Sequence, residues 1–163
     1  MYQRILVPVD GSPTSERGLT EAIHLAALTK GQIRILNVID ELSFALAMDA
    51  YAGQIDDWTN TLRENAARAL TNAQAQAEAA GVPVETTLRE SLGGRVADHI
   101  LSEASSWKAD LIVLGTHGRR GLGRLLLGSD AETVLRQSSV PVLLVRYSES
   151  EQQPGQQDGT PSP

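Results

Sequence analysis

Short apolar runs alternate with longer amphipathic stretches along most of this chain. The apolar runs are rich in Ile, Leu and Val and occupy residues 4–9, 32–39, 84–88, 110–114 and 140–146. Between them, apolar residues recur at helical spacing over residues 13–30, 55–80, 96–104 and 129–137. Strands that alternate with helices in this way predict right-handed βαβ units and a mostly parallel sheet with helices on both faces. We therefore expect a single α/β domain with a five-stranded, Rossmann-like sheet.

Residues with known capping preferences stand at both ends of the first predicted helix. Ser12 precedes Pro13, an order typical of an N-cap followed by the first helical turn. Lys30 and Gly31 close the same periodic stretch, so we expect a basic last turn followed by a glycine stop. Residues 40–54, in contrast, are polar and follow neither period, which predicts an irregular connection.

The composition limits the kinds of protein that this chain can be. Its 163 residues correspond to about one domain. The absence of cysteine excludes a disulfide framework, a thiolate metal site and a cysteine nucleophile. A net charge of −6 argues against general binding to nucleic-acid phosphates. No run approaches the roughly 18 apolar residues of a membrane span, and no signal peptide is recognisable, so we expect a soluble, cytoplasmic protein without a membrane partner.

The end of the chain differs in composition from the rest. Residues 148–163 carry three acids, no Lys or Arg and no apolar side chain, and they are rich in Ser, Gln, Gly and Pro. Such a segment cannot bury enough apolar surface to offset the entropy that is lost on ordering. We therefore predict a folded domain over residues 1–147 and a disordered polar tail over residues 148–163.

Two strand ends carry residues that are suited to binding an anion. In a parallel sheet, ligands gather at the carboxyl ends of the strands. The run Asp10-Gly11-Ser12 follows the first strand, and residues 115–129, which hold five of the 14 glycines, three arginines and no acid, follow the fourth. Glycine lets a backbone approach an anion closely, and the helix that begins near Ser129 would offer its first N–H groups. This pattern indicates a phosphate-binding loop.

The glycine spacing distinguishes this loop from two common nucleotide-binding motifs. Leu126 stands where the G-x-G-x-x-G pattern needs its third glycine, and Ser129 stands where a P-loop needs lysine. The spacing that the loop does have is G-x2-G-x9-G-S, formed by Gly115, Gly118, Gly128 and Ser129. It resembles the nucleotide-binding signature of the universal stress protein family.

Three further segments carry the same resemblance in the same order along the chain. They are ILVPVDGS at residues 5–12, NVID at residues 37–40 and PVLLV at residues 141–145. The resemblance covers residues 2–147 and implies a strand order of 3-2-1-4-5, together with ATP or another adenine nucleotide, often with Mg²⁺. It also implies a homodimer that pairs through the last strand, from Pro141 to Arg146. An apolar strand at a sheet edge independently favours such pairing.

The resemblance also assigns nucleotide-binding positions. Val38 and Leu114 would line the adenine slot, with Asp10 toward the ribose or adenine, while the motif glycines and serine would hold the ribose and the phosphates. Neither a catalytic residue nor a metal-binding residue is expected. The implied nucleotide-binding residues are Pro8, Asp10, Val38, Leu114, Gly115, Gly118, Arg119, Gly128, Ser129 and Asp130.

Several of these residues have an alternative role that needs no ligand. Asp10 could form an Asx-turn before the first helix. Ser129 and Glu132 match the S-x-x-E capping box, in which the serine caps the following helix. Asp130 stands where the family commonly has an apolar residue such as Val. Its charge would repel the outer phosphates unless a metal or the loop arginines intervene, so the choice among ATP, ADP and AMP stays open.

Three classes of function follow from these residues. The first is a nucleotide-binding regulatory or stress-response homodimer, which we expect. The second is a slow ATPase, for which the chain shows no P-loop lysine and no base placed by the sequence pattern. The third is an interaction module that has lost nucleotide binding, an alternative that the charge of Asp130 keeps open.

Overall fold

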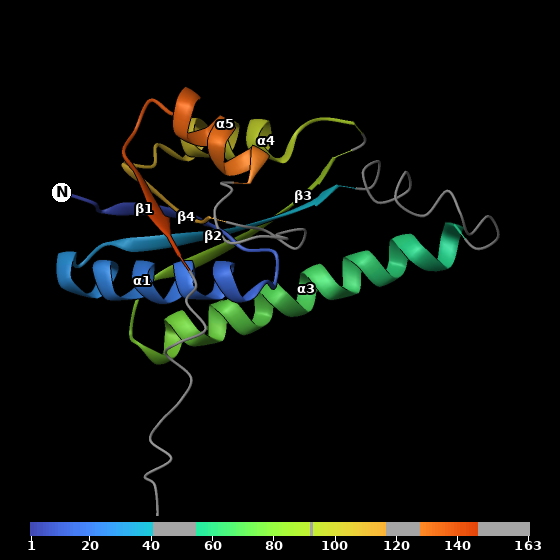
Figure 1. The fold of residues 1–163 in the computed structure, drawn as a ribbon. Coiled ribbons are helices and arrows are strands. Elements are labelled where there is room, and N and C mark those ends of the chain that lie inside the picture. The colour runs from blue at the N-terminus through green and yellow to red at the C-terminus, as the bar shows by residue number, and fades with distance from the viewer. Residues whose placement is uncertain (41–54, 92, 117–127, 147–163) are drawn as a thin grey trace, which may run out of the picture.

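Strands and helices alternate along the described part of the chain in the predicted order. The computed structural model describes residues 1–40, 55–91, 93–116 and 128–146. Its elements are β1 (Arg4–Pro8), α1 (Pro13–Thr29), β2 (Gln32–Asp40), α3 (Ile55–Ala79), β3 (Val84–Ser91), α4 (Val96–Trp107), β4 (Leu111–Gly115), α5 (Ser129–Gln137) and β5 (Val142–Val145). The strands form one parallel, five-stranded sheet of order β3-β2-β1-β4-β5 (Figure 1). The α/β fold class and the strand order 3-2-1-4-5 are thereby confirmed.

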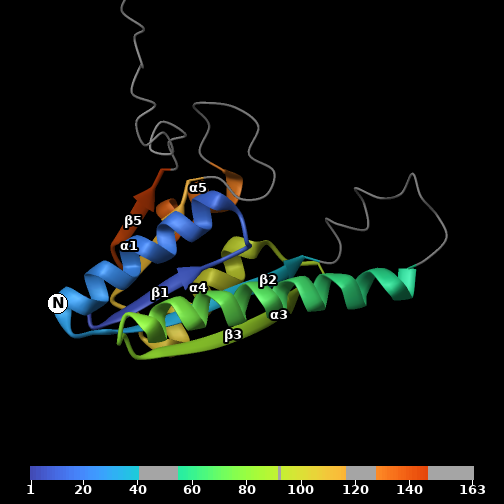
Figure 2. The same ribbon diagram turned by 90° about the horizontal axis from the view of Figure 1, so that it is seen from below.

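The helices form one layer on each face of this sheet. α1 and α3 cover one face, and α4 and α5 cover the other, as the two views in Figures 1 and 2 show. The alternation of side chains along β1 supplies both layers, because Ile5 and Val7 point into the core of α1 and α3 while Leu6 points into the opposite core. Each of these side chains is fully buried, which contributes about 1.5–3 kcal/mol per residue.

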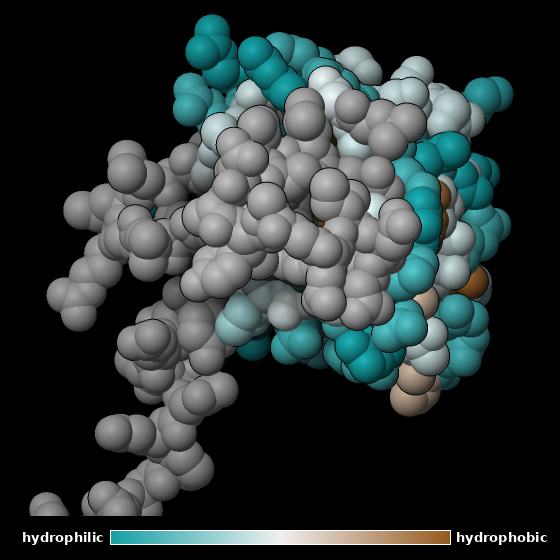
Figure 3. Space-filling view, turned by 90° about the vertical axis from the view of Figure 1, so that its right-hand side faces the viewer, coloured by the Kyte–Doolittle hydropathy of each residue, from teal (hydrophilic) through white to brown (hydrophobic). Residues whose placement is uncertain are grey.

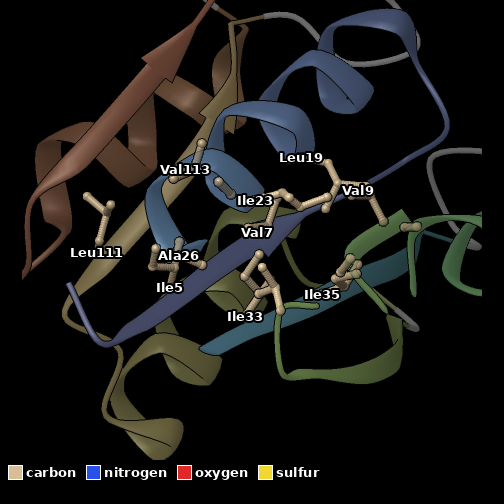
Figure 4. Packing of buried hydrophobic residues seen from close by; sticks show 14 of the residues in the cluster. Ile5, Val7, Val9, Leu19, Ile23, Ala26, Ile33, Ile35, Leu111 and Val113 are labelled. Atoms are coloured by element: carbon tan, nitrogen blue, oxygen red, sulfur yellow. The ribbon is translucent and has the colours of Figure 1, made fainter. Parts of the chain in front are cut away.

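The core beneath α1 and α3 is built from aliphatic side chains of neighbouring strands. Figure 4 shows Val7 of β1 and Val113 of β4 beside Leu19 and Ile23 of α1, while Ile35 of β2 lies in the same core on the side of α3. α1 thus lies over β4 and β1, and its first turn lies close to the carboxyl end of β4, where Gly115 approaches Thr14. This placement brings the predicted Asp10-Gly11-Ser12 turn to the edge where a ligand would bind.

Both ends of α1 are fixed by local backbone geometry. The N–H of Ser15 donates to the Ser12 hydroxyl oxygen at 3.2 Å, which confirms Ser12 as the N-cap. The predicted basic last turn is wrong, because Lys30 lies after the helix as its C-cap and takes the left-handed conformation, with φ of 55°. Gly31 follows this cap, and its N–H closes the helix by donating to the Ala26 carbonyl oxygen at 2.9 Å. Glycine is also required there because a Cβ would lie 2.8 Å from the carbonyl oxygen of Tyr2.

The long helix α3 is attached to the sheet along one apolar face. Its buried residues, Ala66, Leu70, Ala73 and Ala77, recur at helical spacing. The guanidinium of Arg63 also donates two hydrogen bonds to the carboxylate of Glu90 on β3, at 2.8 and 3.0 Å. Neither α3 nor any other helix in the described ranges is long and apolar enough to cross a membrane.

A buried carboxylate connects α4 to the strands beneath it. The side chain of Glu103 is 2% exposed and accepts hydrogen bonds from Arg34 of β2 and Arg89 of β3, each at 2.7 Å. Burial alone would raise the pKa of Glu103, but the hydrogen bonds and positive charges of Arg89 and Arg34 outweigh it, so the pKa is lowered from its ordinary value. The negative charge of Glu103 is therefore a stabilising part of this layer.

Two contacts join the start of β1 to residues far along the chain. The Asp110 carboxylate, just before β4, accepts hydrogen bonds from the N–H groups of Gln3 at 2.8 Å and of Arg4 at 3.0 Å. The Arg4 guanidinium lies over the Trp107 ring of α4, 4.5 Å from its centroid, and Arg34 lies 4.8 Å from the same centroid. The first strand is thus fixed from β4 and α4 as well as from β2.

Candidate functional site

The carboxyl ends of β1, β2 and β4 lie next to one another, and the side of the sheet that they form is the edge where we expect a ligand. From β1 the chain adds β2 and β3 on one side and then returns to add β4 and β5 on the other. The place beside β1 and β4 where the direction reverses is the switch point at which ligands bind in such sheets. Figure 3 faces this side of the molecule, and the described residues that are visible there are mostly hydrophilic.

Predicted adenine-slot residues lie on one face of the sheet at this edge. Val38 and Leu114 both belong to the core of α4 and α5, and Pro8 lies on the same side of β1 as Leu6 of that core. If the pairing of Leu6 with Ile112 is continued by two residues, Pro8 stands level with Leu114. Val38 and Pro8 are half-buried, whereas Leu114 is buried and supports the surface from below. Three adjacent strands thus contribute to one apolar surface.

The predicted Asx-turn at Asp10 is present in the structure. The N–H of Ser12 donates to Asp10 Oδ1 at 2.9 Å, and Gly11 between them has φ of 77°. Ser15 joins the same turn, because its hydroxyl donates to the Ser12 carbonyl oxygen at 2.9 Å and accepts from the Asp10 N–H at 3.3 Å. The turn places the half-buried Asp10 carboxylate directly after β1, and contact of Asp10 with a nucleotide stays a prediction.

Asn37 positions this edge although sequence reasoning gave it no role. It is a buried residue of β2, and its side-chain amide donates to the carbonyl oxygen of Val9 at 2.8 Å. The N–H of Val9 in turn donates to the Leu36 carbonyl oxygen at 2.8 Å, so the chain stays in register with β2 up to Asp10. The available signal was an amide flanked by apolar residues 35–36 and 38–39, because a buried amide needs a hydrogen-bond partner.

The structure gives Gly115 a packing role that is independent of any ligand. A Cβ at this position would lie 2.9 Å from the backbone carbon, the carbonyl oxygen and Cγ2 of Thr14 in α1. Such contacts are shorter than side chains tolerate, so only glycine lets β4 and the first turn of α1 approach this closely. The predicted contact of Gly115 with the ribose or phosphate stays a prediction beside this role.

The start of α5 differs from the predicted capping box. Gly128 is the N-cap and Ser129 is the first helical residue, so Ser129 does not cap the helix. The physical reason is that the Gly128 N–H donates to the Thr116 carbonyl oxygen at 2.9 Å, while the Gly128 carbonyl accepts the first helical bond from the Glu132 N–H, also at 2.9 Å. The Glu132 side chain pairs with Arg136 at 3.7 Å, and the Ser129 side chain is exposed.

Asp130 contacts the N-terminus of the neighbouring helix. Its Oδ1 accepts a hydrogen bond from the N–H of Ala97, in the first turn of α4, at 3.2 Å. The N-cap of α4 is Arg95, which makes no side-chain cap bond of its own. Asp130 therefore acts as the cap of α4 from its place on α5, which the sequence analysis did not foresee.

A cavity of about 210 Å³ lies near the Asp10 turn but on the opposite face of the sheet. Val9 and Leu19, which line it, belong to the core of α1 and α3, whereas Val38 and Leu114 belong to the core of α4 and α5. The cavity is thus separate from the predicted adenine slot. Its lining also includes Ser15, Asn72 and Ala73.

Some predicted residues lie outside the described part of the chain. Gly118 and Arg119 of the glycine-rich segment belong to residues 117–127, and the predicted polar tail also lies outside the described ranges. Among the residues that are described, no three His, Asp or Glu side chains gather so that they could hold a metal ion. The structure therefore brings together Pro8, Asp10, Val38, Leu114 and Gly115 where the strands end, at one edge of the sheet.

Comparisons with known proteins agree with this fold along nearly the whole described chain. The family model described as the universal stress protein family matches residues 1–146. A universal stress protein of Methanocaldococcus jannaschii is 36% identical over 151 residues, which cover 93% of this chain and 86% of that relative. The sequence likeness therefore extends over both halves of the sheet and is not limited to the glycine-rich segment.

Solved structures show the same architecture. A hypothetical protein of Methanocaldococcus jannaschii superposes with a TM-score of 0.76 at 30% identity, covering 91% of this chain and 99% of that one. A universal stress protein solved in complex with cAMP superposes with a TM-score of 0.61 at 28% identity, covering 89% of this chain and 97% of that one.

Proposed function

Because this chain belongs to the universal stress protein family, we propose that it is an adenine-nucleotide-binding regulatory protein of the stress response that acts as a homodimer. The observation that carries the proposal is the edge where β1, β2 and β4 end together at the switch point, with Pro8 and Val38 half-buried on one face. The related structure in complex with cAMP supports an adenine nucleotide as the class of ligand.

Each part of the proposed site suits one part of a nucleotide. The apolar surface at Pro8 and Val38 would contact the base, and the Asp10 turn at the end of β1 would lie toward the ribose. The phosphate would approach the first turn of α5, where Ser129 offers a backbone N–H and an exposed hydroxyl. Gly118 and Arg119 of the motif would complete the phosphate contacts.

The ligand proposed for this edge is ATP, AMP or another adenine nucleotide. Where Mg²⁺ accompanies it, the phosphates would hold the ion, since the described residues provide no cluster of three side chains to do so. We propose a regulatory role without turnover, in which binding changes the surface or stability of the protein. The alternative to this regulatory role is a slow ATPase activity. It would be established if the protein releases phosphate from ATP and an Asp10→Ala variant does not.

The proposed dimer pairs two copies of β5. β5 is the outermost strand beside β4. In the described fold, its outer row of backbone N–H and C=O groups has no strand partner. Leu143 at its centre is 37% exposed. Pairing from Pro141 to Arg146 with a second copy would satisfy the backbone groups and cover the apolar side chains in one isologous contact.

Nucleotide binding can be tested by thermal melting with AMP, cAMP and ATP, each with and without Mg²⁺. A ligand at about 100 times its dissociation constant stabilises the native state by about 2.7 kcal/mol, which corresponds to a shift of about 5–10 °C for a chain of this size. Ser129→Ala should weaken binding without lowering the melting temperature of the ligand-free protein, because Ser129 does not cap α5.

Ser139→Ala provides the matched control, because Ser139 is an exposed serine beyond the other end of α5. We expect it to bind the same nucleotide as tightly as the unmodified protein. If no adenine nucleotide shifts the melting temperature of the unmodified protein, the proposed function is wrong and an interaction module that has lost nucleotide binding replaces it.

A further inference from the structure

The N-termini of α4 and α5 converge on one carboxylate. Asp130 is the second residue of α5, and its Oδ1 lies 3.2 Å from the N–H of Ala97, the second residue of α4. The side chain therefore lies at the positive ends of two helices at once. The other acid in the first turn of α5, Glu132, instead pairs with Arg136 one turn further along, at 3.7 Å.

The charge of Asp130 is similar in size to the combined partial charges of the two helix N-termini. Each helix N-terminus is equivalent to roughly half a positive elementary charge, so the two ends together supply about one. The carboxylate of Asp130 supplies one negative charge at the same place, and the two contributions approximately cancel. An incoming phosphate would therefore meet N–H donors at α5 whose long-range attraction for anions has already been neutralised.

We propose that Asp130 determines which phosphate chain the site accepts, so that adenine nucleotides with a single phosphate bind in preference to the triphosphate. This inference rests on the proposed nucleotide site. One phosphate can use the N–H groups at the start of α5 through short hydrogen bonds, which do not require a net positive field. Each further phosphate adds negative charge beside Asp130, and the dipoles of the two helix ends, which Asp130 already balances, do not offset that charge.

The matched variants are Asp130→Asn and Glu132→Gln, each of which removes one charge from the first turn of α5. Asp130→Asn keeps an oxygen that can accept from the Ala97 N–H, so the cap of α4 is retained. We expect calorimetry to show that Asp130→Asn strengthens ATP binding by up to about tenfold, or about 1.4 kcal/mol, and AMP binding by less than about threefold. Glu132→Gln should leave the ratio of the two affinities unchanged.

The outcomes separate this inference from the proposed function. If Asp130→Asn and the unmodified protein show the same ratio of ATP to AMP affinity, Asp130 does not select the phosphate chain, although nucleotide binding itself stands. If neither protein binds any adenine nucleotide, the proposed function fails and this inference fails with it. If Asp130→Asn melts well below the unmodified protein, the test is the ratio of ATP to AMP affinity in the unmodified protein alone. ATP binding as tight as AMP binding would contradict the inference.

Discussion

Replacing Gly115 with alanine should push β4 and α1 apart. The new Cβ would lie 2.9 Å from three atoms of Thr14, two of which belong to the backbone. Carbon atoms in ordinary contact are about 3.5–4.0 Å apart, so the two elements must separate by several tenths of an ångström. Thr14 lies in the first turn of α1, directly after the Asp10 turn, and the displacement would therefore reach the candidate site.

The size of the effect follows from two opposing contributions. Overpacking of this kind costs about 1–3 kcal/mol, whereas replacing glycine by alanine restricts the unfolded chain and returns about 0.4–1 kcal/mol. We expect Gly115→Ala to lower the free energy of unfolding by about 1–2 kcal/mol. The melting temperature should then fall by about 2–8 °C, and this loss should appear without any nucleotide.

Gly18 provides a matched control on the other side of the same contact. A Cβ on Gly18 would meet the Gly115 nitrogen at 3.5 Å, which is an ordinary contact. Because Gly18 lies inside α1, Gly18→Ala should be neutral or stabilise the helix by up to about 1 kcal/mol. Urea unfolding of both variants measures the difference. If Gly115→Ala is as stable as Gly18→Ala, the close approach of β4 and α1 does not explain why glycine stands at residue 115.

The remaining predictions concern the buried carboxylate and the sheet edge. Glu103→Gln should lower the free energy of unfolding at neutral pH by about 2–4 kcal/mol, measured in urea, because it leaves Arg34 and Arg89 without their buried charge partner. Since the pKa of Glu103 is lowered in the folded protein, its contribution is present above the ordinary value of 4.5 and is lost as the pH falls through the folded value. The difference in unfolding free energy between Glu103→Gln and the unmodified protein should therefore narrow at acidic pH. A difference that stays constant would contradict the role assigned to the Glu103 charge. Light scattering at about 100 μM should give the mass of a dimer, whereas a monomer mass would refute pairing through β5.

Local chemistry allowed part of this structure to be predicted from the sequence. The parallel sheet followed from apolar runs that alternate with helical periodicity. Ser12 was predicted as a cap because it stands directly before Pro13, and the structure shows its hydroxyl accepting from the N–H of Ser15. The strand order came from the family resemblance, which the glycine spacing carries. The position of Asp10 after β1 required no information beyond the strand end.

Contacts between distant residues set the limits of that prediction. Gly128 replaces Ser129 as the cap of α5 because of a hydrogen bond to Thr116, which lies directly after β4. Asp130 contacts Ala97 on α4, whereas a sequence pattern that considers one helix at a time assigns the charge of Asp130 to the N-terminus of α5. Gly115 was assigned to a ligand because the approach of α1, which begins about a hundred residues earlier, leaves no trace in the local spacing.

The hydrogen bonds between Asp110 and the start of β1 bear on how the chain folds as it is synthesised. β1 is made first, but Asp110 follows Arg4 by 106 residues, and β4 comes directly after it. β2 can join β1 early because little chain separates them, whereas the opposite edge of β1 has no partner until β4 emerges. Until then an apolar strand edge stays open, and such edges pair with other chains. The first strand to be made is thus open to wrong pairing until about two-thirds of the chain has been synthesised.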